Sequence, residues 1–394
     1  MLFREADSAA LLPRAEVSDA SVEAAHVTEP TPPRRSNRLL NLDLMRGYFV
    51  LILAAVHLNY VPSLFGWFDG RGVLWASEAD GFFFISGMLV AMLRKRDLAK
   101  GGLVLATQRS WRRARQLYVV ACGLTLFYTA LGRFMADQDV HGVKGGLDAH
   151  SSWLEVVWRT LTLRYVYGWA DFLTFYVPMF IVAPVLVWAL TKRWDWLVVV
   201  LSLGAYVALT WWYPGPAQPF LQWQAPFVLG AVVGFHFDEL RAWFAGMRRA
   251  ARLTLAVAAM VAAAAIYAVG LLMLFHPSWH PPTSGVDTPG LYNTLLGNNR
   301  LGLLRPLLCL VMFAGGYVAL SYLQRPVMAT IGRLLELFGQ NSLYVYVVQS
   351  FFVFMVPFVL KPHGFFVNTA LDLAIVALVW LGLKTNFLTK YIPR

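Results

Sequence analysis

Ten long apolar segments recur along this chain, and they constrain its fold more than any other feature of the sequence. Each approaches the roughly 17–25 residues that an α-helix needs to cross the hydrocarbon core of a bilayer. Only 14% of the residues are charged, against roughly 25% in soluble domains. The segments are residues 44–62, 73–93, 116–135, 169–190, 195–213, 221–237, 252–275, 301–323, 341–360 and 365–388. The sequence therefore predicts an all-α polytopic membrane protein with about ten transmembrane helices.

Basic residues are unevenly distributed between these segments, within a net charge of +11. Clusters of Lys and Arg follow every second segment, beginning with residues 94–115, whereas residues 214–220 carry no charge and residues 276–299 carry no Lys or Arg. Because Lys and Arg concentrate in cytoplasmic loops, this alternation predicts that both termini lie in the cytoplasm. Topology accounts for the positive charge, so we expect no binding to nucleic acid.

The first forty residues differ from the rest of the chain. They are rich in Ala, Glu, Ser and Pro, and no apolar core follows a basic start as it would in a cleavable signal peptide. Such a composition is typical of disorder. We therefore expect a disordered cytoplasmic tail over residues 1–40 and a membrane domain over residues 41–394.

Two ionisable residues share one face of the first apolar segment. Arg46 and His57 are eleven residues apart, which is about three helical turns and roughly 16 Å along the axis. Ionisable side chains inside a membrane helix are costly to bury and usually functional. With the predicted topology, Arg46 lies near the cytoplasmic end with Asp43, and His57 lies near the outer end. The alternative is an Arg that extends to the interface and a structural His bonded to a backbone carbonyl.

Glu78 is expected at the same depth as His57, because the second apolar segment runs back from the outer side. A carboxylate paired with an imidazole orients the ring and raises its basicity, as a general base requires. We therefore predict His57, Glu78 and Arg46 as the candidate catalytic residues.

Further polar groups lie at the outer ends of later segments. Amides, an indole, a carboxylate and a guanidinium there are suited to binding sugar hydroxyls, although each also has a structural explanation as a helix cap or packing group. These acceptor-binding candidates are Asp171, Gln222, Trp223, Gln224 and Arg300.

Several catalytic signatures are missing from the sequence. There is no phosphate-binding Walker loop, no zinc-type His/Cys spacing and no Gly-x-Ser-x-Gly nucleophile motif. Cys122 and Cys309 each lie within an apolar segment, where inert packing is the expected role. We expect neither a metal site nor a bound cofactor.

The Arg46-to-His57 spacing resembles the hallmark of the membrane acyltransferase 3 superfamily. Within it, the sequence motifs are closer to those of the OpgC-type branch, the osmoregulated periplasmic glucan succinyltransferases. The matching pieces are LDLMRG at residues 42–47, SEADGFFFISG at 77–87, DFLTFYVP at 171–178, QWQAPFVLG at 222–230 and LFGQNSLYV at 337–345.

This resemblance implies an enzyme of the bacterial inner membrane that moves an acyl group from acyl-CoA to a hydroxyl of a periplasmic glucan or another envelope polysaccharide. Succinyl-CoA is the expected co-substrate. His57 would be the catalytic base, and the donor would be held by Arg46, Asp43, Arg112 and Arg113. Two alternatives stay open at this stage: a transporter or flippase of a polysaccharide or lipid-linked precursor, and an envelope sensor or scaffold.

Overall fold

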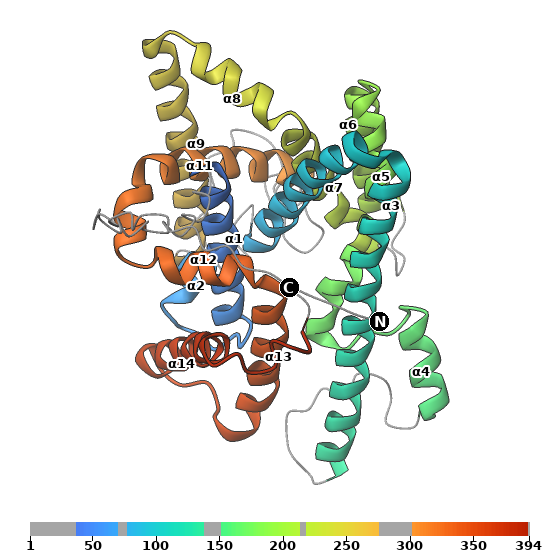
Figure 1. Ribbon diagram of the computed structural model, residues 1–394. Helices are drawn as coiled ribbons and strands as arrows, with labels where there is room; N and C mark the ends of the chain where they lie inside the picture. The colour runs from blue at the N-terminus through green and yellow to red at the C-terminus, as the bar shows by residue number, and fades with distance from the viewer. Residues whose placement is uncertain (1–36, 70–76, 138–150, 213–217, 276–301, 393–394) are drawn as a thin grey trace, which may run out of the picture. The chain divides into compact units, whose positions relative to one another are not determined.

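Helices account for nearly all of the regular structure in the computed structural model, which describes residues 37–69, 77–137, 151–212, 218–275 and 302–392 (Figure 1). No strand occurs within these ranges. The helices are α1 (Asn37–Val56), α2 (Phe65–Asp69), α3 (Glu78–Asp137), α4 (Trp153–Leu161), α5 (Asp171–Thr191), α6 (Asp195–Trp212), α7 (Gln218–Phe235), α8 (Phe237–Gly246), α9 (Arg249–Phe275), α11 (Arg305–Ala329), α12 (Gly332–Gln340), α13 (Ser342–Val359) and α14 (Phe365–Lys384), with a 3₁₀ turn, η2 (Gly168–Ala170), before α5.

The expected class is confirmed: the described part of the chain is all-helical and membrane-spanning in character. Six helices are long and apolar enough to cross a bilayer, namely α3, α5, α9, α11, α13 and α14. A total of about ten spans, with both termini in the cytoplasm, stays a prediction. Residues 1–36 of the predicted tail lie outside the described residues, whereas residues 37–40 already belong to α1.

The helix formed by the first apolar segment ends earlier than the pattern of apolar residues predicted. We expected a helix over residues 44–62, but α1 stops at Val56. Asn59 has a φ of 55°, which an α-helix does not accommodate, and Pro62 has no N–H for a helical hydrogen bond. The functional consequence is that His57 stands in the turn directly after α1.

The two helices expected over residues 73–93 and 116–135 are both present, as the two arms of α3 on either side of a kink. The basic stretch between them, expected as a loop, is helical on both sides of the kink, because its Arg, Lys, Leu and Ala residues are good helix formers. The helix is bent sharply where Gly101 and Gly102 leave helical geometry, with a φ of 65° at Gly102. Figure 1 shows the two arms of α3 meeting at this bend.

Close packing of α3 against α7 depends on glycine. A Cβ atom at Gly87 would overlap the carbonyl oxygen of Phe227, and one at Gly230 would overlap that of Phe84. Small residues allow membrane helices to approach this closely.

Substitution of Gly87 by Ala should therefore destabilise the protein. The methyl group has no room at the crossing, and overpacking of this kind costs about 1–3 kcal/mol. A thermal unfolding experiment in detergent checks this. Gly123→Ala, on the same helix, is the matched control because nothing lies within 4 Å of its Cβ position. Equal melting temperatures for the two variants would contradict this account of the α3–α7 crossing.

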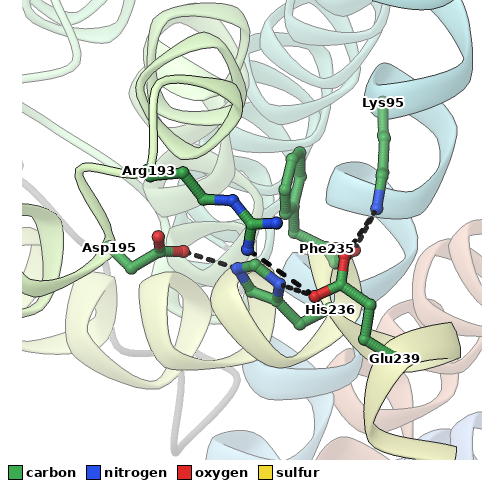
Figure 2. A network of polar contacts seen from close by, with 6 residues as sticks. All are labelled: Lys95, Arg193, Asp195, Phe235, His236 and Glu239. Atoms are coloured by element: carbon green, nitrogen blue, oxygen red, sulfur yellow. Dashed lines mark hydrogen bonds and ion pairs between the residues drawn. The ribbon is translucent and has the colours of Figure 1, made fainter. Parts of the chain in front are cut away.

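A polar network joins α3, α6, α7 and α8 (Figure 2). His236, between α7 and α8, contacts Asp195 of α6 at 2.6 Å through Nε2 and Glu239 of α8 at 2.8 Å through Nδ1. Lys95 of α3 donates to the carbonyl oxygen of Phe235 at 2.8 Å. The hydrogen bond from His236 lowers the pKa of the Glu239 carboxyl. Both ring nitrogens of His236 therefore face carboxylates.

Candidate active site

Arg46 joins α1 to α12 in the interior of the helix bundle. Its Nη2 lies 3.0 Å from Asp43 Oδ1, one turn earlier on α1, and its Nε donates to the carbonyl oxygen of Gly339. The two helices touch backbone to backbone, because a Cβ atom at Gly47 would overlap the carbonyl oxygen of Leu335. The Arg-Gly pair therefore supplies both the charge and the room for this crossing.

His57 keeps its place relative to Arg46 although α1 has ended. Its backbone N–H still donates to the Leu53 carbonyl at 3.2 Å, which continues the helical hydrogen-bond pattern by one residue. The ring nitrogen Nδ1 lies 3.0 Å from Nε2 of Gln349 on α13. The ring also packs edge-on against Tyr346, with the centroids 6.3 Å apart. The His57 side chain is thus held by two residues one turn apart on α13.

A cavity of about 390 Å³ lies between α1, α5, α13 and both arms of α3. This volume falls within the roughly 300–1,000 Å³ that is typical of small-molecule sites. Along α3 its lining extends from Phe82 to Arg94, about 18 Å of helical rise. The cavity is therefore elongated in the direction that also separates Arg46 from His57.

One end of this cavity is strongly basic. Its lining contains five arginines and no Asp or Glu: Arg46, Arg94, Arg109, Arg112 and Arg113. Asp97, beside the cavity, pairs with Arg94 at 3.1 Å and also with Arg109, and Arg46 and Arg113 are close enough to interact electrostatically. Guanidinium groups gathered in this way form an anion site, and planar guanidinium forks suit phosphate groups.

The other end of the cavity is aromatic and lies beside the residue that packs on His57. Phe172 and Tyr346 both line it, and their rings stack with centroids 5.8 Å apart. Tyr346 also contacts the His57 ring, so a single side chain separates the cavity from the imidazole. The arrangement connects a site for an anion with a buried base.

The structure does not place Glu78 directly on the His57 ring. The side-chain hydrogen bond of the ring is with Gln349, and the Glu78 carboxyl instead contacts Asp69 at the end of α2. Asp69 in turn interacts electrostatically with His57. The two groups thus belong to one region, but a carboxyl from a short helix that the sequence did not predict stands between them.

The acceptor-binding candidates are scattered. Asp171 opens α5, where its carboxylate accepts the Phe172 N–H at 2.6 Å, and it interacts electrostatically with Tyr346. Gln224 is engaged in helix packing, since it exchanges two hydrogen bonds with Ser202 of α6. Arg300 lies outside the described residues.

The other two members of this group point into the protein. Trp223 stacks on Phe83, with the centroids 5.1 Å apart, and lies 5.8 Å from the guanidinium of Arg305. Gln222 is buried, with 6% of its surface exposed. The Arg305 guanidinium is itself paired with a carboxylate of the protein, since its Nη2 lies 2.7 Å from Asp80 Oδ2.

The sequence reasoning missed several residues of this site. Gln349 is one of them, and nothing in the sequence links it to His57. Arg94 and Arg109 could have been found, because they belong to the same basic stretch as Arg112 and Arg113. Among the described residues, no group of three or more His, Cys, Asp or Glu side chains converges as for a metal ion.

Taken together, the helices and the cavity define a multi-pass membrane protein with a buried histidine beside a basic, ligand-sized cavity. A family model described as OpgC protein matches residues 38–386 of the chain. The chain therefore belongs to the OpgC protein family. Membership assigns it to membrane-associated enzymes of the transferase type that modify glucans. No curated protein and no solved structure gives a significant match.

Removal of the Gln349 amide should impair His57 without unfolding the protein. We expect Gln349→Leu to lower kcat about 10- to 100-fold, as loss of a group that orients a catalytic or metal-bound histidine commonly does, with little change in melting temperature. Gln324→Leu is the matched control, because that amide bonds to Asn41 on the far side of α1. A Gln349→Leu enzyme with full activity would contradict the positioning role.

Proposed function

We propose that this protein is a membrane O-acyltransferase that moves an acyl group, succinyl in the first instance, from acyl-CoA to a hydroxyl of a periplasmic glucan or a related envelope polysaccharide. We further propose that it acts in the bacterial inner membrane, with the donor approaching from the cytoplasm and the acceptor from the periplasm.

One observation carries this proposal: the cavity is lined by five arginines at one end and touches the residue that packs on His57 at the other. Coenzyme A carries its phosphates at one end and its thioester at the other. An elongated cavity with anion-binding groups far from the base fits that distribution of charge. Transport alone would not require a base at the end of an anion site.

The proposed reaction is a direct transfer. The hydroxyl oxygen of the acceptor attacks the thioester carbonyl carbon while His57 takes the hydroxyl proton. The carbon–sulfur bond then breaks, and the proton passes from the imidazolium to the leaving thiolate. His57 Nε2 can take the hydroxyl proton only when Nδ1 carries a hydrogen, so Gln349 serves both steps with its amide turned to present the carbonyl oxygen to Nδ1.

The carboxyl groups behind His57 have an electrostatic role in this scheme. Asp69 interacts with His57, and Glu78 contacts Asp69. A negative charge at Asp69 favours the imidazolium that forms as the hydroxyl is deprotonated. We therefore propose that Glu78 acts through Asp69 as a positioning residue. Among the acceptor-binding candidates we assign Asp171 to the acceptor, because it interacts with Tyr346, which packs on His57.

The assay that tests this function uses purified protein, radiolabelled succinyl-CoA and a periplasmic glucan preparation. We expect labelled glucan with the natural chain and a loss of about 10²- to 10⁴-fold with His57→Ala, the range that a general base contributes. His363→Ala is the matched control, because this histidine is exposed and its Nδ1 contacts only a nearby backbone carbonyl. A well-folded His57→Ala variant with normal transfer would refute the mechanism.

The arginine cluster makes a separate prediction about the donor. Arg112→Gln and Arg113→Gln should each raise KM for acyl-CoA about 10- to 100-fold, because a hydrogen bond to a charged group is worth about 1.5–3 kcal/mol. The kcat should change little, since the phosphates lie far from the reacting carbon. Arg96→Gln is the control, because Arg96 lies on the same helix but does not line the cavity. Equal KM values in all three variants would show that acyl-CoA does not bind in this cavity.

A further inference from the structure

A second, much smaller cavity lies behind the turn that carries His57. It has a volume of about 10 Å³, and its oxygen-bearing lining side chains are Asn59, Tyr60, Ser63, Asp69 and Asp372. A space of roughly 10–15 Å³ holds one water molecule or one bare ion. Its polar lining comes from three separate parts of the chain, namely the turn after α1, the end of α2 and the interior of α14.

Helix α14 already holds this turn through three consecutive polar contacts. Asn368 Nδ2 donates to the carbonyl oxygen of Pro62 at 3.0 Å, and the N–H of Leu64 donates to Thr369 Oγ1 at 2.9 Å. Asp372, one turn further along α14, forms a side-chain hydrogen bond with Ser63. The position of His57 therefore depends on whether the polar side chains on this surface of α14 have their hydrogen-bond partners.

The acidic groups around the small cavity form no ion pair with the described residues. Asp372 is 1% exposed, and its Oδ2 has no hydrogen-bond partner. The Asp69 carboxyl is hydrogen-bonded to another carboxyl, Glu78, whose Oε2 is without a partner. The nearby Arg305 interacts electrostatically with Glu78, but it is bonded to Asp80. A buried carboxylate with an unpartnered oxygen is costly, so a cation bound at Asp372 would be strongly held.

We propose that Asp69, Asp372, Ser63 and Asn59 form a binding site for a dehydrated calcium ion. The donors are oxygen atoms only, which selects a hard cation rather than zinc or copper. Magnesium retains several waters and would need more room, whereas calcium accepts a cage of protein oxygens in flexible geometry. The ion would tie the turn that carries His57 to α2 and α14. The site itself does not depend on the proposed acyltransferase activity, and in the calcium-bound protein Asp69 would act on His57 by fixing the turn rather than by its negative charge.

Terbium luminescence gives a direct test with the full-length purified protein, because Tyr60 lines the cavity and can sensitise a bound lanthanide. We expect a saturable signal that calcium displaces and that magnesium displaces at least about tenfold less effectively. Asp372→Asn should weaken binding at least about tenfold, and Ser63→Ala should weaken it less. Asp195→Asn is the matched control, since that carboxylate belongs to the His236 network.

A thermal shift keeps the proposal testable if Asp372→Asn does not fold. Calcium should raise the melting temperature of the natural chain and of the Asp195→Asn variant, and raise that of Ser63→Ala by less. No sensitised signal in the natural chain, or an equal signal in Asp372→Asn, would overturn the proposal. No calcium-induced shift in the natural chain, with an Asp372→Asn protein as stable as the natural chain, would show instead that Asp372 is simply protonated. Neither measurement requires substrate, so failure here is separate from failure of the proposed function.

Discussion

The burial of one guanidinium group organises much of this structure. Arg46 lies in the helix bundle with 20% of its side chain exposed, and a charge in that position requires partners. Asp43 provides one on the same helix, and the carbonyl oxygen of Gly339 provides another on α12. The second bond forms only because glycine at positions 47 and 339 lets the two backbones touch. Fixing α1 at this end also fixes where its other end places His57.

The site follows from that placement because α13 continues the chain directly after α12. The segment that accepts the Arg46 hydrogen bond is followed by Tyr346 and Gln349, which hold the His57 ring. The first arm of α3 runs alongside and then turns back at Gly101 and Gly102, which brings its basic stretch to the Arg46 end of the same cavity. Charge therefore accumulates at one end and aromatic surface at the other.

The sequence predicted the features that depend on composition and short-range spacing. Apolar runs located most helices, and Arg46, Arg112 and Arg113 were predicted together before the structure placed them around one cavity. The helical conformation of the basic stretch on either side of the kink in α3 was not predicted, because a positive loop and a positive helix have the same composition. The contact between Gln349 and His57 could not be predicted either, since 292 residues separate the two and a buried amide has many structural uses. Asp69 was missed because α2 is a single helical turn.

The central claim is that Arg46 and His57 mark two ends of one path across the bilayer. Proteoliposomes that contain the purified enzyme in a known orientation, with labelled acyl-CoA on one side of the membrane and glucan on the other, test it most directly. The account predicts labelled glucan when the donor is on the side of Arg112 and Arg113 and the acceptor is on the side of His57, and no product from the reverse arrangement. Efficient transfer only when donor and acceptor share one side would contradict it.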